Sequence, residues 1–196
     1  MSIDLGSENF DSFLKTIDIL YVEDEDSVRE LLEKRLAKHF GTIYSAPNGE
    51  VGLYKFETYR PRIVVTDIRM PIMNGIEMLK AIKEKSQDAR AIVTTAHSDS
   101  EYMIQSIDIG IDKYIVKPVN VDTLVTAIKK IAIGFYNEDM SKEYQRQRAQ
   151  EKIIESTKNV FEQISNSIPS PLALFKDGKS VFMNEKFLEL FSTERI

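Results

Sequence analysis

The feature that most constrains the fold of this chain is an alternation, from Thr16 to about Tyr136, between short apolar runs and amphipathic helical stretches. The five apolar runs are rich in β-branched residues and read TIDILYV (16–22), TIYS (42–45), RIVVT (62–66), RAIVTT (90–95) and KYIVK (113–117). The first, third and fourth runs are apolar almost without a break, which is typical of strands buried on both faces of a sheet. Five strands alternating with five helices predict a doubly wound α/β domain with a five-stranded parallel sheet and right-handed crossovers.

Apolar residues between and after these runs recur at the three- and four-residue spacing of helices. Helices are therefore expected around residues 28–36, 51–56, 76–82, 102–107 and 121–131. Residues that favour turns fall between the expected elements and support the same boundaries: Pro47-Asn48-Gly49, Pro61, Pro71, Asn74-Gly75 and Gly110.

Composition excludes several kinds of site. The 196 residues contain no cysteine, which rules out a disulfide scaffold, and the two histidines, His39 and His97, are too far apart in sequence for a zinc site. The net charge of −5 disfavours binding of a nucleic-acid backbone by charge. No apolar run approaches the roughly 20 residues of a membrane span, and the acidic N-terminus lacks the features of a secretory signal, so a cytoplasmic location is expected.

Residues outside the alternating region differ in character. Residues 1–15 are polar, with Phe10, Phe13 and Leu14 at near-helical spacing, and they predict an arm or a short helix that packs on the next domain. We assign residues 16–136 to the main α/β domain. The window 135–168 contains no glycine or proline, which predicts a helical linker over residues 137–167 that continues from the last helix of that domain.

Apolar residues near the end of this linker follow the spacing of a coiled coil. Ile153, Thr157, Val160 and Ile164 are separated by four, three and four residues, and Ile154, Phe161 and Ile168 lie seven apart beside them. This pattern suits one side of a two-helix coiled coil, so we expect a homodimer through residues 137–167. A lone solvated helix is the alternative.

Residues 168–196 change character again. Leu172–Phe175 and Ser180–Met183 predict two short strands, with Asp177-Gly178 as the hairpin turn between them. Asn184 is expected to cap a helix that carries Phe187, Leu188 and Phe191. Roughly 30 residues is below the size at which a domain usually folds unaided.

Chemically reactive residues follow the expected strands. In a doubly wound sheet, ligands bind outside the carboxyl ends of the strands. Glu23 and Asp24 follow the first strand and Asp67 follows the third, so three carboxylates should converge at one edge. Such carboxylates repel one another at neutral pH unless a cation lies between them, and a hard divalent ion such as Mg²⁺ is the natural partner.

Thr95 follows the fourth strand and Lys117 the fifth. A hydroxyl donor and an ammonium supply what a phosphoryl group needs. Each residue alone has an ordinary explanation, as a solvated turn, a helix cap or a loop. Together, at the ends of different strands, they predict a site that receives a phosphoryl group on a carboxylate next to Mg²⁺.

At this point the sequence closely resembles the receiver domain of two-component response regulators, over about residues 16–136. The resemblance is carried by ILYVEDED (19–26), IVVTDIRMPIMNG (63–75), AIVTTAHSD (91–99) and DKYIVKPVN (112–120). It implies the flavodoxin-like receiver fold and transfer of a phosphoryl group from a sensor histidine kinase or a phosphotransfer protein. It also implies no enzymatic activity beyond self-phosphotransfer and self-dephosphorylation.

The resemblance implies roles for single residues. Asp67 would be the phosphoacceptor. Asp24 would bind Mg²⁺ directly and Glu23 through water, and the backbone carbonyl of Arg69 would be a further ligand.

It also implies a switch. Thr95 would be the switch hydroxyl, Lys117 the phosphate-contacting lysine in a cis bond to Pro118, and Tyr114 the switch aromatic. The change would then be relayed through the last helix to a C-terminal output. His97, in a position that varies in the family, is interpreted as a surface imidazole.

Residues 168–196 resemble the opening of a PAS sensor domain, through PLALFKDGKSVFMNEKFLELF. This resemblance implies that the chain is a piece of a longer regulator, whose output domain it does not identify.

Three other functions compete with this interpretation. A haloacid-dehalogenase-type phosphohydrolase also uses an aspartate nucleophile that follows a strand, but it needs an acid two residues later, where this chain has Arg69. A degenerate receiver that acts only as an interaction module would not need all five residues at the strand ends, which are Glu23, Asp24, Asp67, Thr95 and Lys117. A nucleotide-binding enzyme would need a glycine-rich phosphate loop, which the sequence lacks.

Overall fold

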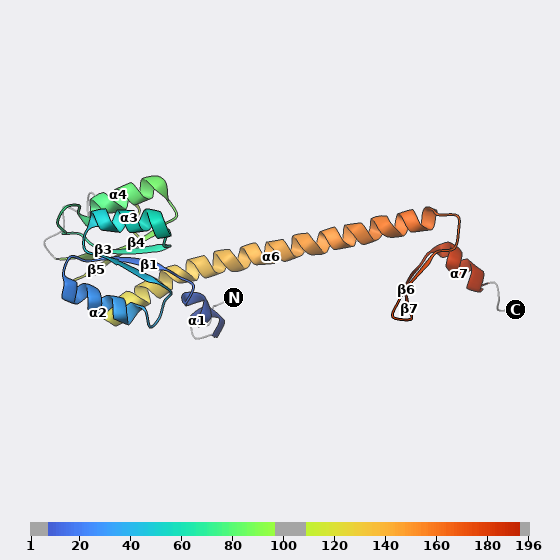
Figure 1. The fold of residues 1–196 in the computed structure, drawn as a ribbon, viewed down its shortest axis with the longest axis horizontal. Helices are drawn as coiled ribbons and strands as arrows, with labels where there is room; N and C mark the ends of the chain where they lie inside the picture. Colours follow the sequence, from blue (N-terminus) through green and yellow to red (C-terminus); the bar gives the residue numbers. More distant parts are fainter. Residues whose placement is uncertain (1–7, 97–108, 193–196) are drawn as a thin grey trace. The chain divides into compact units, whose positions relative to one another are not determined.

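A five-stranded sheet with the order β2-β1-β3-β4-β5 forms the centre of the first of two units, Met1–Glu138 (Figure 1). The computed structural model describes residues 8–96 and 109–192. The strands are β1 (Ile19–Val22), β2 (Ile43–Ala46), β3 (Ile63–Asp67), β4 (Arg90–Thr95) and β5 (Lys113–Val116). Every neighbouring pair is parallel, which confirms the predicted doubly wound sheet.

Helices cover both faces of this sheet (Figure 1). One face packs against α1 (Glu8–Leu14), α2 (Asp26–Leu36) and the first turns of α6 (Val121–Ser167). The other face packs against α3 (Gly49–Tyr59) and α4 (Gly75–Lys85). The sheet is therefore the middle of three layers.

Alternation along β1 divides the core into two clusters. Ile19 and Tyr21 belong to the cluster with α1, α2 and α6, whereas Leu20 and Val22 belong to the cluster with α3 and α4. All four side chains are fully buried. This is why the run is continuously apolar, because successive side chains of a strand point to opposite faces and both faces are covered.

Two helices begin at asparagines that the sequence places between elements. The Asn48 side chain accepts a hydrogen bond from the Val51 amide at 3.0 Å and starts α3. The Asn74 side chain accepts from the Glu77 amide at 2.9 Å, and the Glu77 carboxylate accepts from the Asn74 amide at 3.1 Å. This reciprocal capping box starts α4 directly after the loop that follows Asp67.

The sequence placed most of the elements well but began the first strand too early. Residues 16–18 precede β1, because the Thr16 and Ile17 amides donate to Phe13 and Leu14 carbonyls and so continue the last turn of α1. Asp67 is the last residue of β3, one position later than expected. The helix expected at 102–107 and the interpretation of His97 lie outside the described residues.

The second unit, Asp139–Ile196, contains most of α6, which is one helix of 47 residues and confirms the predicted continuity beyond the last helix of the sheet domain. Strands β6 (Ala173–Lys176) and β7 (Lys179–Met183) form an antiparallel hairpin. Asp177 and Gly178 both have positive φ, at 51° and 75°, as a two-residue type I′ turn requires.

Asn184 connects three segments of the second unit and precedes α7 (Glu185–Ser192). Its side-chain oxygen accepts from the Phe187 amide at 3.0 Å, which confirms the expected cap, and from the Leu172 amide at 2.8 Å. Its amide nitrogen donates to the carbonyls of Ser165 and Ser170, both at 3.0 Å. Asn184 itself is fully buried; its bond to Ser165 is buried and the other three bonds are partly buried.

None of the helices in the described part of the chain is long and apolar enough to cross a membrane.

Candidate phosphoryl-acceptor site

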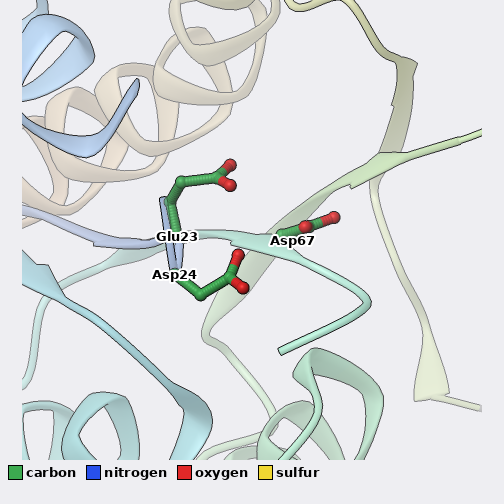
Figure 2. A group of neighbouring side chains, drawn as sticks. All are labelled: Glu23, Asp24 and Asp67. Carbon is green, nitrogen blue, oxygen red and sulfur yellow. The ribbon is translucent and has the colours of Figure 1, made fainter. Parts of the chain in front are cut away.

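Three carboxylates meet where β1 and β3 end. Val22 and Thr66 are partners in the parallel ladder, so the residues that follow them, Glu23, Asp24 and Asp67, emerge at the same edge. Each offers one oxygen, and these oxygens lie within 4.8 Å of one another (Figure 2). Asp24 is exposed, whereas Glu23 and Asp67 are buried. The predicted convergence of the three carboxylates is therefore present.

Lys117 lies between the two buried carboxylates. Its ammonium is 2.8 Å from Asp67 Oδ2 and 3.1 Å from each oxygen of Glu23. The lysine follows β5, and its backbone amide donates to the Thr95 carbonyl at 2.8 Å, which connects the ends of β4 and β5. The Lys117–Pro118 bond is cis, as the resemblance implied.

Burial and charge act in opposite directions on these groups. Burial raises the pKa of Glu23, the Lys117 ammonium lowers it in part, and Asp67 and Asp24 raise it further, so the net shift is upward. Burial disfavours the charged form of Lys117, but hydrogen bonds and charges from Asp67 and Glu23 outweigh burial and raise the pKa of the lysine. Three carboxylates face one ammonium, which leaves two negative charges uncompensated when all are ionised.

Two supporting residues were missed by sequence reasoning. The Tyr21 hydroxyl is buried and donates to Glu23 Oε2 at 3.4 Å. Arg29 donates to the backbone carbonyls of Glu23 at 2.7 Å and Asp24 at 3.3 Å. The available signals were weak: Tyr21 lies two positions before Glu23 and thus on the same face of the strand, and Arg29 lies one turn into the following helix.

Three further residues were expected to belong to the site: Thr95, Tyr114 and Arg69. Thr95 ends β4, is buried, and donates its hydroxyl to the Ala96 carbonyl at 3.1 Å. Tyr114 lies in β5 and packs, partly buried, against the cluster of α3 and α4. Arg69 is exposed and lies two residues after Asp67. The structure thus places the ends of β1, β3, β4 and β5 together, as their order in the sheet requires.

The backbone behind Asp67 leaves no room for a side chain at Gly75. The Gly75 amide donates to the Ile68 carbonyl at 2.9 Å, and a Cβ on Gly75 would lie 2.0 Å from the Asp67 carbonyl oxygen. The Asp67 side chain accepts from the Ile68 amide at 2.8 Å. The glycine therefore allows α4 to start directly against the end of β3, which helps to hold the Asp67 carboxylate in place.

We expect Gly75→Ala to destabilise the sheet domain by about 1–3 kcal/mol, the usual cost of overpacking, because the clash is with backbone that cannot rotate away. Urea unfolding measures the change. The matched control is Gly134→Ala in α6, where an added Cβ meets nothing within 4 Å and should stabilise the helix by about 0.5–1 kcal/mol. Equal effects of the two substitutions would contradict the steric argument.

Comparison with known proteins agrees with this geometry. The family described as response regulator receiver domain matches residues 19–129, more than half of the chain. The chain therefore belongs to the response regulator receiver family.

Among curated relatives, chemotaxis protein CheY of Bacillus subtilis is 35% identical over 113 residues, which cover 57% of this chain and 94% of CheY. Regulatory protein AtoC of Escherichia coli is 33% identical over 112 residues, or 57% of this chain. The DNA-binding transcriptional regulator NtrC of Salmonella typhimurium is 34% identical over 117 residues, or 60% of this chain. The matched region spans only 24% and 25% of the lengths of AtoC and NtrC.

Solved structures agree as well. The N-terminal domain of an uncharacterized protein from Wolinella succinogenes has a TM-score of 0.59 and 33% identity, and the match covers 65% of this chain and 99% of that one. A CheY-like receiver domain protein from Methanospirillum hungatei has a TM-score of 0.60 and 27% identity, over 63% and 98% of the two chains.

Proposed function

We propose that residues 16–136 receive a phosphoryl group on Asp67 from a sensor histidine kinase or a phosphotransfer protein. The observation that carries this proposal is the contact of one ammonium, that of Lys117, with both Asp67 and the buried Glu23 beside a third carboxylate. The family of the chain supports the phosphoacceptor role. The competing phosphohydrolase function is disfavoured because Arg69 stands where that chemistry needs an acid.

The donor set of the site fits Mg²⁺. Hard carboxylate oxygens, two uncompensated negative charges and one solvent-exposed ligand, Asp24, suit an ion that keeps several waters and takes few protein ligands. Asp24 and Asp67 would hold the ion directly, Glu23 through water, and the Arg69 carbonyl would complete the protein ligands. The bound ion would supply positive charge to the phosphoryl oxygens.

In the proposed transfer, an oxygen of Asp67 forms a bond to phosphorus as the bond between phosphorus and the histidine nitrogen of the partner breaks. The electron pair of that bond stays on the imidazole, and the product on this chain is an acyl phosphate. The Lys117 ammonium already contacts Asp67 Oδ2 and is placed to neutralise charge on the incoming group.

The Thr95 hydroxyl and the Tyr114 ring form the proposed switch. The Thr95 hydroxyl now donates to its neighbouring carbonyl, and it would turn to the phosphoryl oxygens when they arrive. Tyr114 is partly buried and would move further inward as Thr95 turns. This change at β4 and β5 would be relayed through α6 to an output that follows it.

A parallel homodimer through residues 137–167 would carry the relay. The apolar residues with coiled-coil spacing, among them Ile153, Ile154 and Ile164, are 65%, 69% and 59% exposed and form an apolar stripe along α6. Burying such a stripe against a second copy removes apolar surface from water. Residues 168–196 would be the start of a PAS-like domain, a proposal supported by the hairpin, its type I′ turn and the Asn184 cap. The proposed location is the cytoplasm.

Acetyl phosphate tests the acceptor role without a kinase. The full chain with Mg²⁺ and acetyl phosphate should gain the mass of one phosphoryl group, and the adduct should be lost on treatment with hydroxylamine, which cleaves acyl phosphates. Chelation of Mg²⁺ should prevent the gain. A chain that gains no mass, or gains a hydroxylamine-resistant adduct, would contradict the proposal.

Mg²⁺ affinity should fall at mildly acid pH. Because the pKa of Glu23 is raised, protons compete with the ion at a higher pH than for an ordinary glutamate. Below that pKa the apparent Kd should rise by up to about tenfold per pH unit, since one proton must leave. Calorimetric titration with Mg²⁺ at pH values from about 7.5 to about 5.5 measures this dependence of the Kd. In Glu23→Gln the dependence should be flatter, and an unchanged slope would exclude Glu23 as the titrating group.

A further inference from the structure

Helix α1 lies before the residues that match the receiver family, yet it is part of the core. The match begins at residue 19, whereas α1 covers Glu8–Leu14. Phe10 is fully buried and Leu14 is 1% exposed, both in the cluster shared by α2, the sheet and α6. Burial of large apolar side chains such as these stabilises the packed arrangement. This helix therefore lies outside the matched residues and is nevertheless packed into the core of the domain.

The attachment is centred on Tyr136, which lies in the part of α6 that belongs to the first unit, residues 121–138, here called the base of α6. The Phe10 ring meets the Tyr136 ring edge to face at 5.5 Å, and the Phe13 ring does the same at 5.1 Å. Asp11 of α1 lies 4.0 Å from Lys129, two helical turns before Tyr136. Edge-to-face aromatic pairs of this kind stabilise a contact beyond the burial of their apolar area. Helix α1 thus contacts α6 along two turns.

Two further contacts fix the positions of α1 and of the base of α6. The Lys15 ammonium, directly after α1, donates to the carbonyls of Ala37 at 3.3 Å and Lys38 at 2.8 Å, at the end of α2. On α6, the buried ring of Phe135 lies 3.9 Å from the Arg62 guanidinium, which precedes β3. The base of α6 is therefore held both by α1 and by the sheet.

The rest of α6 has a different environment. Every side chain from residue 141 to residue 161 is exposed, whereas Phe135 is buried and Tyr136 is partly buried. Any change that the receiver passes along α6 must therefore leave through the turns that α1 contacts.

We propose that α1 is a clasp in which Phe10 and Phe13 hold Tyr136 and so set the resting position of α6, the helix that relays phosphorylation. This inference rests on the relay through α6 proposed above. Phe10 and Phe13 are positioning residues, because they act on the relay only through Tyr136. If α1 served stability alone, loosening it would lower the unfolding free energy without changing where the base of α6 lies.

Spin labels separate these two roles, and the absence of cysteine allows clean labelling. Cysteines replace Thr58 of α3 and Asn137 of α6, both exposed, in the full chain. We expect Phe13→Ala to broaden the distance distribution between the labels and to raise amide exchange over residues 132–138 by about tenfold or more, with exchange in β3 unchanged. Phe13→Tyr keeps the ring and should restore both.

The matched control is Tyr144→Ala, which removes an exposed aromatic side chain of α6 outside the clasp and should change neither measurement. An unchanged distance distribution in Phe13→Ala, or exchange that rises equally in β3, would overturn the clasp. If Phe13→Ala does not fold, Phe13→Leu replaces it with the same expectations at smaller size.

Disulfide crosslinking along residues 140–165 tests the effect on relay. In the otherwise wild-type chain, acetyl phosphate should change the crosslinking pattern, and in Phe13→Ala the patterns with and without it should become alike. Phosphorylation of Asp67 should proceed within about twofold of the wild-type rate, because the ring contacts of Phe13 are with Phe10 and Tyr136 and not with Asp67 or Lys117. A wild-type crosslinking pattern that acetyl phosphate does not change would overturn the proposed relay through α6. A Phe13→Ala pattern that acetyl phosphate changes as in wild type would overturn the proposed role of α1.

Discussion

Asp67→Asn should leave the chain without any hydroxylamine-sensitive phosphoryl adduct. The amide is nearly the same size as the carboxylate and should preserve the acceptance of a hydrogen bond from the Ile68 amide at 2.8 Å. It is, however, not a nucleophile at neutral pH, so the loss should exceed about a thousandfold in rate. Intact mass after treatment with acetyl phosphate and Mg²⁺ measures the result.

The control for this substitution is Asp24→Asn, which keeps Asp67 as the acceptor and removes the exposed carboxylate from the cluster of three. Its Mg²⁺ affinity should fall, while the adduct on Asp67 still forms at high Mg²⁺. An adduct of undiminished rate in Asp67→Asn would place the acceptor elsewhere. Loss of both adducts at every Mg²⁺ concentration would show that the two carboxylates act as one unit.

Lys117→Ala should slow phosphorylation from acetyl phosphate by about a hundredfold to a thousandfold, as loss of one preorganised donor to a developing anion does elsewhere. The ammonium contacts Asp67 and both oxygens of Glu23, so its removal leaves a buried carboxylate pair without a cation. The pKa of Glu23 should rise further, because Lys117 is the group that lowers it. Initial rates of phosphorylation at saturating Mg²⁺ and about pH 7.5 measure the loss.

Lys113→Ala is the matched control for the lysine. Lys113 is exposed and has the same charge as Lys117. It lies at the start of β5, whereas Lys117 follows the end of β5, where the site is. Its removal should leave the rate within about twofold, since an exposed charge at a distance is largely screened. Equal losses in the two variants would mean that general charge, and not the contact with Asp67, accounts for the effect.

The fold could be predicted well because its signals are local. Runs such as Ile19–Val22 are apolar at every position because both faces of the sheet are covered, and Asn74 with Glu77 can start a helix without help from distant residues. The boundary at Thr16 was wrong for the opposite reason. Its amide and that of Ile17 bond back to α1, and a β-branched composition does not reveal such a partner.

The candidate site divides in the same way. The sequence alone was sufficient to place Glu23, Asp24, Asp67 and Lys117 after their strands, since reactive groups at strand ends follow from strand periodicity and the rule for parallel sheets. It did not indicate the hydrogen bond from Tyr21, because a tyrosine within an apolar strand is equally consistent with simple core packing.

What the sequence determined by itself was therefore the order of strands and helices along the chain and the chemical kind of residue at each strand end. Both depend on residues that are neighbours in the chain. Only the tertiary structure decided that the Lys117 ammonium would lie between Asp67 and Glu23, 94 positions from the latter, and that α1 would pack against Tyr136. These contacts depend on which strands lie side by side and which helices share a face. Burial in the folded chain, and not the local pattern, brings such distant groups together.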